Sequence, residues 1–363
     1  MHNETTDFRI SPNETNIIKG IAICAMLFHH LFYETVAYGN WTQQIAIVCK
    51  VCVSMFLFVS GYGMTVQYSK LDCHRVRDRI TSTLKFLLRR LIKFYLNYWA
   101  MFIIIVPLGT FVLGRTLSIA YGTDNSIWSN LVKDILGIQG ADSYIITWWF
   151  NALILSLYLL FPLLYRLMER KSIAAGFTIL LFLWPREYIV DNFFYIFYLW
   201  NSNLTLYTLV FVLGIFAAQH IKSINIFLNK IKIQLVFTFS LLVSISLCFA
   251  RQLFTEGYAD QITLDAFITI FVVLSIVAFR RMTRLRINPL AILGKHSMNI
   301  YLIHTFILMF FFPKFIFTCK FSPIIFIALL GESFAASTTI EFIKRKTKFY
   351  KLQDRILKLF SIE

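Results

Sequence analysis

The stretch IIKGIAICAMLFHHLFYETVA, residues 17–37, is long and apolar enough to cross a membrane as a helix. It nevertheless contains Lys19, the adjacent His29 and His30, and Glu34. Burying an ionised group at hydrocarbon depth costs about 2.5 to 3.5 kcal/mol on insertion scales, so such groups usually face a cavity or have a function. Lys19 and His30 are separated by about three helical turns, which places them on one face with a rise of roughly 16 Å between them. This face is therefore the first candidate for chemistry.

The composition is that of a polytopic membrane protein. Of the 363 residues, 58% are hydrophobic and only 15% are charged, and apolar runs of about twenty residues recur along the chain. We therefore expect an all-α bundle of about ten transmembrane helices. The predicted spans are residues 17–37, 43–67, 87–113, 145–166, 172–189, 203–219, 233–250, 262–279, 297–317 and 321–343.

The net charge of +16 is explained by membrane topology rather than by nucleic-acid binding. With the amino terminus in the cytoplasm, 28 Lys and Arg residues fall in predicted inner segments and six in predicted outer segments. This asymmetry is what the positive-inside rule expects. Both termini are therefore predicted to be cytoplasmic, in a multi-pass protein of the cell inner (plasma) membrane. An anionic cytosolic ligand is a second explanation for some of the charge.

The chain is predicted to form one membrane domain, because no Gly/Ser-rich or Pro-rich linker interrupts the apolar runs. This domain covers residues 17–343 and follows a cytoplasmic segment, residues 1–16. Residues 344–363 alternate basic and apolar side chains, which predicts a cytoplasmic amphipathic helix on the anionic inner leaflet. The longest outer loop, residues 114–144, is either a lid or acceptor-binding surface or a solvated connector.

The first predicted helix favours acid–base chemistry at His30. Glu34 would lie one turn further along nearly the same face, where its carboxylate could fix the tautomer of His30 and stabilise the imidazolium. His29 points about 100° away, so the two histidines cannot share one role. Alternatively, His30 simply hydrogen-bonds across a helix interface, as polar residues in membranes often do.

Four short motifs occur in order along the chain. They are Lys19 and His30 with ten residues between them, FLFVSGY at residues 56–62, RRLIKFY at 89–95, and LGKHSMNIYLIH at 293–304. In this order the chain resembles the integral-membrane acyltransferase 3 family, whose members modify surface and secreted glycans. The resemblance extends to Trp148, Trp149 and Phe150 in the fourth span. It implies O-acetylation: transfer of an acyl group, usually acetyl from acetyl-CoA, to a sugar hydroxyl, with His30 as the essential residue.

Two positions depart from the family pattern. Lys19 replaces the more common arginine, and Lys93 is the second basic residue of the R-x-x-R motif that begins at Arg90. Lysine keeps the charge but lacks the planar fork that binds phosphate through two hydrogen bonds. The affinity for the acyl donor is therefore expected to differ.

A basic cluster at the start of the third span is the predicted donor site. Coenzyme A is a cytosolic polyanion, and Arg90 and Lys93 are neighbours on a helix because they are three residues apart. Arg89, Arg90 and Lys93, together with Lys19, are therefore expected to bind acyl-CoA. The alternative is that they are ordinary positive-inside anchors.

Seven further polar or aromatic residues are predicted to bind substrate or line a tunnel. In the ninth span, Ser297, Tyr301 and His304 recur at four and three residues and would form one stripe facing the bundle. A polar stripe that only packs helices is an equal alternative. Glu332 would need a basic partner at membrane depth. The full set is Ser60, Tyr62, Trp149, Ser297, Tyr301, His304 and Glu332.

The sequence therefore predicts a membrane O-acyltransferase of the cell envelope that modifies a polysaccharide or lipid-linked sugar. Its partners would be acyl-CoA as co-substrate, the glycan acceptor, membrane lipids and glycan-assembly proteins. No nucleic acid, no metal and no permanently bound cofactor are expected; Cys49 and Cys52 form a C-x-x-C inside a span and are interpreted as packing residues. Two alternatives remain, namely an exporter or flippase without acyl chemistry and a structural subunit of an assembly complex. The acceptor sugar and the acyl group are left open.

Overall fold

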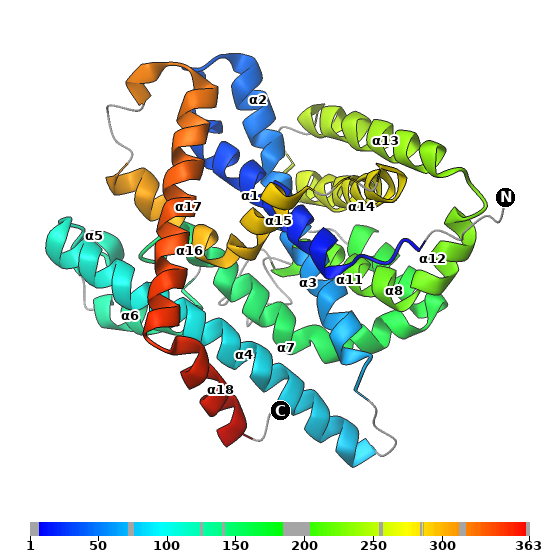
Figure 1. Cartoon of the computed structure of the whole chain (residues 1–363), viewed down its shortest axis with the longest axis horizontal. Coiled ribbons are helices and arrows are strands. Elements are labelled where there is room, and N and C mark those ends of the chain that lie inside the picture. Colours follow the sequence, from blue (N-terminus) through cyan, green and yellow to red (C-terminus); the bar gives the residue numbers. More distant parts are fainter. Residues whose placement is uncertain are drawn as a thin grey trace. The chain divides into compact units, whose positions relative to one another are not determined.

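The computed structural model describes residues 7–71, 76–123, 126–139, 142–183, 204–253, 257–283, 285, 287–311 and 317–360. Within these ranges every regular element is a helix and there is no strand, so the predicted all-α fold is confirmed. Figure 1 labels the helices in chain order. Their contacts group them into two compact units. Unit 1 comprises Met1–Gln67, Phe161–Asn192 and Thr205–Ser297, and unit 2 comprises Tyr68–Leu160, Phe193–Leu204 and Met298–Glu363.

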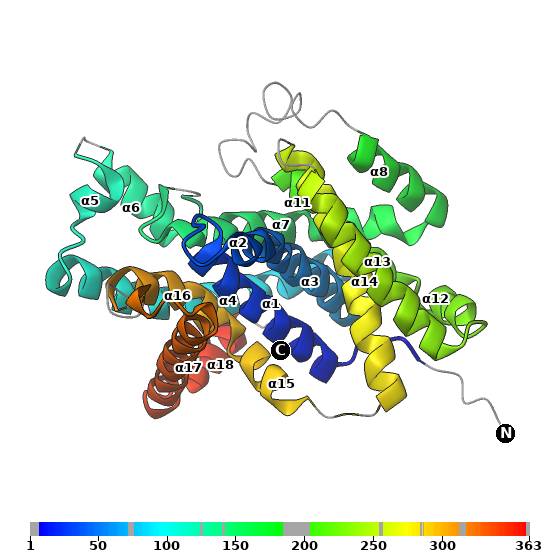
Figure 2. The same cartoon turned by 90° about the horizontal axis from the view of Figure 1, so that it is seen from above.

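Unit 1 contains the amino-terminal helices and a later pair, α13 and α14, that pack along each other (Figure 2). One side of α13 is apolar and exposed, since Phe239 is 63% and Leu235 59% exposed, as expected for a surface in contact with lipid. The helices of this unit are α1 (Pro12–Phe32), α2 (Asn40–Val48), the short η1 (Cys49–Val51), α3 (Cys52–Tyr68), α8 (Lys171–Leu183), α11 (Leu204–Gln219), α12 (Ile221–Leu228), α13 (Ile233–Leu253), α14 (Tyr258–Thr283) and α15 (Asn288–Lys295).

Unit 2 contains a long helix, α4, whose apolar carboxyl-terminal end leads into the predicted outer loop. The helix α7 begins in this unit and ends in unit 1. The elements of unit 2 are α4 (Val76–Pro107), η2 (Leu108–Val112), α5 (Leu117–Tyr121), α6 (Ile127–Ile135), η4 (Ile146–Trp148), α7 (Trp149–Glu169), α16 (Ser297–Phe310), η5 (Phe317–Cys319), α17 (Ser322–Lys346) and α18 (Phe349–Leu359).

The start of α1 is fixed by a capping box. Ser11 Oγ accepts a hydrogen bond from the Glu14 N–H, and the Glu14 carboxylate accepts one from the Ser11 N–H, so two unpaired helix-end donors are satisfied. Pro12 follows the cap, where its fixed φ suits the first helical turn. The helix therefore begins five residues before the predicted span, and it ends at Phe32.

Two glycines bring α1 and α15 into close contact. A Cβ at Gly20 would overlap the carbonyl oxygen of Leu290, and a Cβ at Gly294 would overlap that of Asn16. Each helix therefore presents a glycine to the backbone of the other, as small residues do between membrane helices. Gly294 belongs to the LGKHSMNIYLIH motif, so packing accounts for this motif position.

Seven helical segments among the described residues are long and apolar enough to cross a membrane. Joined helices α11 and α12 would make an eighth, although they bend by 76°, and the shorter apolar helices in residues 171–182 and 297–310 lie at two more predicted spans. Residues 184–189, 203 and 312–316 of the predicted spans lie outside the described residues. A multi-pass membrane protein is thus confirmed, while the number ten, the domain limits and the cytoplasmic termini stay predictions.

Candidate functional site

The carboxyl-terminal end of α1 holds both histidines, and both are half-buried. His29 Nδ1 lies 2.8 Å from the Ala46 carbonyl oxygen, which can only accept, so this nitrogen donates the hydrogen bond. The His30 ring centroid lies 5.1 Å from that of His29 and 6.2 Å from that of Tyr33. The structure therefore fixes the orientation of His29 through the backbone of α2 and places His30 beside it.

Glu34 does not lie on the helical face predicted for it. Because α1 ends at Phe32, Glu34 is in the exposed turn that follows, and its carboxylate accepts a hydrogen bond from the Tyr33 hydroxyl. Burial, together with this carboxylate, raises the pKa of Tyr33 to about 12, which keeps the phenol protonated as a donor. The sequence argument failed here because it extended the helix over a turn that the structure places outside it.

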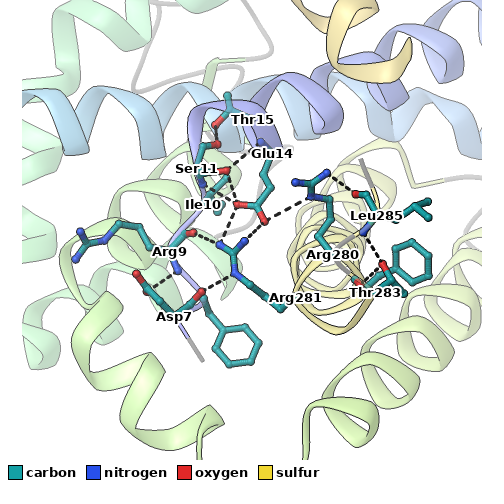
Figure 3. Close-up of polar contacts among 12 residues, drawn as sticks. Asp7, Arg9, Ile10, Ser11, Glu14, Thr15, Arg280, Arg281, Thr283 and Leu285 are labelled. Carbon is teal, nitrogen blue, oxygen red and sulfur yellow. Dashed lines mark hydrogen bonds and ion pairs between the residues drawn. The ribbon is translucent and has the colours of Figure 1, made fainter. Parts of the chain in front are cut away.

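Half-buried Lys19 lies in the amino-terminal half of α1. Figure 3 shows a charge cluster at the start of this helix. Glu14 is fully buried, and its carboxylate accepts hydrogen bonds from Arg281 Nη1 at 2.6 Å and Nη2 at 3.1 Å. Arg281 also donates to the carbonyl oxygens of Asp7 and Arg9. The cluster ties the segment before α1 to the end of α14.

The SGY part of the second motif is explained largely by packing within unit 1. Half-buried Ser60 precedes Gly61, where a Cβ would overlap the carbonyl oxygen of Phe211 in α11. Tyr62 is 3% exposed, and its hydroxyl accepts a hydrogen bond from the Ile10 N–H at 3.0 Å. Tyr62 thus also holds the segment before α1, which leaves its predicted role in substrate binding untested.

A buried ion pair in unit 1 was not singled out from the sequence. Arg251 of α13 is 1% exposed and Asp265 of α14 is fully buried. Arg251 Nε donates to Asp265 Oδ1 at 2.6 Å, and Arg251 Nη2 donates to Oδ2 at 3.2 Å. The available signal was a single acidic residue within the predicted span 262–279, preceded fourteen residues earlier by an arginine at the end of another span.

The predicted donor-binding cations lie on consecutive turns of α4 in unit 2. Arg89 and Lys93 are exposed, and half-buried Arg90 places its guanidinium carbon 5.6 Å from the centroid of the Phe86 ring. The charge of Asp354 in α18 acts on Lys93, since α18 contacts α4. The structure thus presents these three cations together, as predicted from their spacing, although their role stays a prediction.

The polar residues of α16 contact the start of α7 in unit 2. The Tyr301 hydroxyl donates to the Thr147 carbonyl oxygen at 2.9 Å and lies 3.2 Å from Asn151 Oδ1. His304 is fully buried, and its Nδ1 donates to carbonyl oxygens of its own helix. These contacts match the alternative of a packing stripe. The role of half-buried Ser297, at the first position of α16, stays a prediction.

The adjacent residues Trp148 and Trp149 differ in burial. Trp148 is 1% exposed and its Nε1 donates to the Leu302 carbonyl oxygen at 3.0 Å, whereas Trp149 is half-buried. The predicted role of Trp149 in substrate binding stays a prediction.

Glu332, on α17, is half-buried. Its Oε2 has no hydrogen-bond partner among the described residues, so a basic partner, as the sequence suggested, is not found for this atom within them.

The predicted outer loop is anchored by Asp134, which is 1% exposed. Its Oδ2 accepts hydrogen bonds from the Tyr121 hydroxyl and the Tyr144 N–H, each at 2.6 Å, and its carbonyl oxygen accepts one from Tyr98. Burial raises the pKa of Asp134, although these hydrogen bonds oppose the shift. This carboxylate is held by Tyr121 and Tyr144 of the loop and by Tyr98 of α4, which makes it a structural anchor.

Comparison with known proteins identifies the family. Residues 13–342, nearly the whole chain, match the family model described as an acyltransferase domain, Acyltransferase 3, and this confirms the resemblance found in the sequence. No curated protein and no solved structure matches the chain. The matched residues include the end of α1 with His30, the basic turns of α4 and the whole of α16. The chain is therefore a multi-pass membrane protein that belongs to the acyltransferase 3 family.

Proposed function

We propose that this acyltransferase moves an acyl group, acetyl in the simplest case, from cytosolic acyl-CoA to a hydroxyl of a surface glycan or lipid-linked sugar in the inner membrane. One observation carries the proposal beyond the family. A single unbroken helix, α1, bears Lys19 and His30 on one face, with both side chains half-buried. A base at membrane depth is what proton removal from a hydroxyl requires when the site excludes water.

His30 is the proposed general base. The acceptor hydroxyl gives its proton to the imidazole while its oxygen attacks the thioester carbonyl carbon, and the proton then passes to the departing sulfur of CoA. Imidazole suits this role because it can accept a proton and later donate it. Glu34, in the turn beyond α1, is retained as a polar neighbour of the site, with its carboxylate bound to Tyr33.

Arg89, Arg90 and Lys93 are the proposed contacts for the phosphates of the donor. Arg89 and Arg90 can each offer two parallel N–H groups to a phosphate, whereas Lys93 offers a point charge. Lys19, on α1, stays a predicted contact for the acyl donor. The exposure of Arg89 and Lys93 supports this assignment, because a binding cation has to be reachable.

The test compares surface and lipid-linked glycans by mass spectrometry from cells with the intact protein and with His30→Ala at matched membrane abundance. We expect the variant to lose a base-labile acyl increment, which would also identify the acyl group. His220→Ala is the control, since it removes another half-buried imidazole of unit 1 that is bonded to the Met168 carbonyl oxygen. Unchanged acylation in His30→Ala would refute His30 as the base. Altered glycan export with normal acylation would favour a transporter.

A further inference from the structure

Arg251 contains a hydrogen-bond donor without an acceptor. Two of its nitrogens, Nε and Nη2, are bound by Asp265, but Nη1 is buried and has no partner among the described residues. Buried donors are nearly always paired, so one left unpaired in a folded protein needs an explanation. Because the guanidinium is planar and Asp265 binds its Nε and Nη2, the direction of the Nη1 N–H groups is fixed as well.

The donor belongs to the region around the end of α1. Arg251 lies in the last turn of α13, next to Gln252, whose side chain donates to the Gln44 carbonyl oxygen of α2 at 3.0 Å. The helix contacts place Asp265 of α14 in the same region, since η1 contacts both α1 and α14 within unit 1. His29 in turn is held by the Ala46 carbonyl oxygen and lies next to His30, with 5.1 Å between ring centroids.

We propose that Arg251 Nη1 donates a hydrogen bond to the carbonyl oxygen of the acyl thioester and stabilises its negative charge during transfer. The inference rests on the proposed function. Two substrate oxygens meet at His30: the acceptor hydroxyl, which must lose a proton, and the acyl carbonyl, which gains charge. A guanidinium is always protonated and cannot accept a proton, so only the carbonyl oxygen suits it.

The step balances without a further reactant. The acceptor oxygen forms a bond to the carbonyl carbon as its proton moves to the imidazole, and the C=O π electrons move to the oxygen that Arg251 holds. When this oxyanion collapses, the C–S bond breaks, its electron pair goes to sulfur, and the imidazolium returns the proton to that sulfur. The products are the ester and CoA. A charged donor fixed beforehand by Asp265 has no reorganisation to undergo during the reaction.

The test is the double variant Arg251→Met/Asp265→Leu, which removes one positive and one negative charge together. A buried ion pair replaced by apolar residues of similar volume is often neutral for stability, so this protein should fold. In membranes that contain the acceptor, with labelled acetyl-CoA, we expect kcat to fall about 100-fold or more. The KM for acetyl-CoA should change little, because the contact strengthens only as charge develops on the oxygen.

A second readout does not depend on turnover. The infrared carbonyl stretch of acetyl-CoA, labelled with ¹³C at the thioester carbonyl and bound to purified protein, should lie at lower wavenumber in the parent protein than in the double variant. The control is Lys171→Met, which removes another hydrogen-bonded cation of unit 1, bound to Ser223 Oγ, and should behave as the parent.

The outcomes separate the two proposals. An unchanged kcat, or an identical carbonyl stretch, in a double variant with the parent's thermal stability would overturn the role of Arg251 while leaving acyl transfer intact. A parent protein that neither binds acetyl-CoA nor transfers acetyl would overturn the proposed function and this inference with it. If the double variant fails to fold, Arg251→Lys decides: the ammonium can keep the Asp265 pair but loses the fork, so parent-like kcat in that variant would also contradict the proposal.

Discussion

Arg281 Nη1 donates to Glu14 Oε1 over 2.6 Å and so joins the last turn of α14 to the first turn of α1 (Figure 3). Glu14 is fully buried, whereas the Arg281 side chain is 29% exposed, so the arginine charge is partly hydrated and the carboxylate is not. The same carboxylate caps α1 through Ser11. One acidic residue therefore fixes both where the helix begins and what it packs against.

Glu14→Gln should lower the free energy of unfolding by about 2 kcal/mol, because two charge-assisted hydrogen bonds to Arg281 become weaker or are lost. The measurement is thermal or denaturant unfolding of the protein in detergent. Glu169→Gln, at an exposed acidic residue of unit 1, provides the control and should be near neutral. Equal stability of the two variants would show that the Glu14 cluster contributes no more than a surface charge.

The stability of the outer loop should depend on pH through Asp134. Burial raises its folded-state pKa above the ordinary value, so the folded protein binds the proton more readily than the unfolded chain does. This contribution is fully present below the unfolded pKa and is lost as pH rises through the folded pKa. Asp134→Asn should remove this dependence, since the amide oxygen can still accept from Tyr121 and Tyr144.

Asp134→Leu serves as the contrasting variant, because it leaves two buried donors without an acceptor. We expect it to lower stability by about 3 kcal/mol at every pH at which the protein folds. Protease resistance of the loop across a pH series distinguishes the two variants. A pH profile of Asp134→Asn identical to that of the parent would rule out Asp134 as the titrating group.

Donor affinity should respond in opposite directions to two charges in unit 2. Lys93→Met should raise the KM for acetyl-CoA about fourfold, since an exposed charge contact is worth up to about 1 kcal/mol. Asp354→Asn should lower that KM about twofold, because the acidic charge that acts on Lys93 is removed. Both effects should shrink at high salt. Lys133→Met, at an exposed cation of the predicted outer side, is the control. A KM for acetyl-CoA that rises in Lys133→Met but not in Lys93→Met would contradict the assignment.

Tyr301→Phe should separate packing from substrate binding. The variant loses the hydrogen bond from its hydroxyl to the Thr147 carbonyl oxygen, so stability should fall by about 1 kcal/mol. If the hydroxyl only joins α16 to η4, the KM values should stay within about twofold of the parent, as for loss of a contact that no substrate makes. A large rise in either KM without loss of stability would restore the predicted role of Tyr301 in a substrate tunnel.

The sequence by itself determined the fold class and the family. Long apolar runs commit a chain to helices, since lipid offers no partner for a backbone N–H or C=O, and each predicted span contains helix among its described residues. The motif order also predicted membership of the acyltransferase 3 family, because such motifs are local and can be compared residue by residue. The spacing of Arg89, Arg90 and Lys93 likewise predicted neighbours on one helix, which follows from helix geometry alone.

Only the tertiary structure decided which charged groups meet. Helical periodicity placed Glu34 on the same face as His30, but α1 ends before Glu34. The residue at which a helix ends depends on how the following segment packs. Arg251 and Asp265 belong to different helices. Glu14 and Arg281 form an ion pair although 267 positions separate them in the sequence. Such pairs depend on helix packing between distant segments, which periodicity along a single helix does not encode.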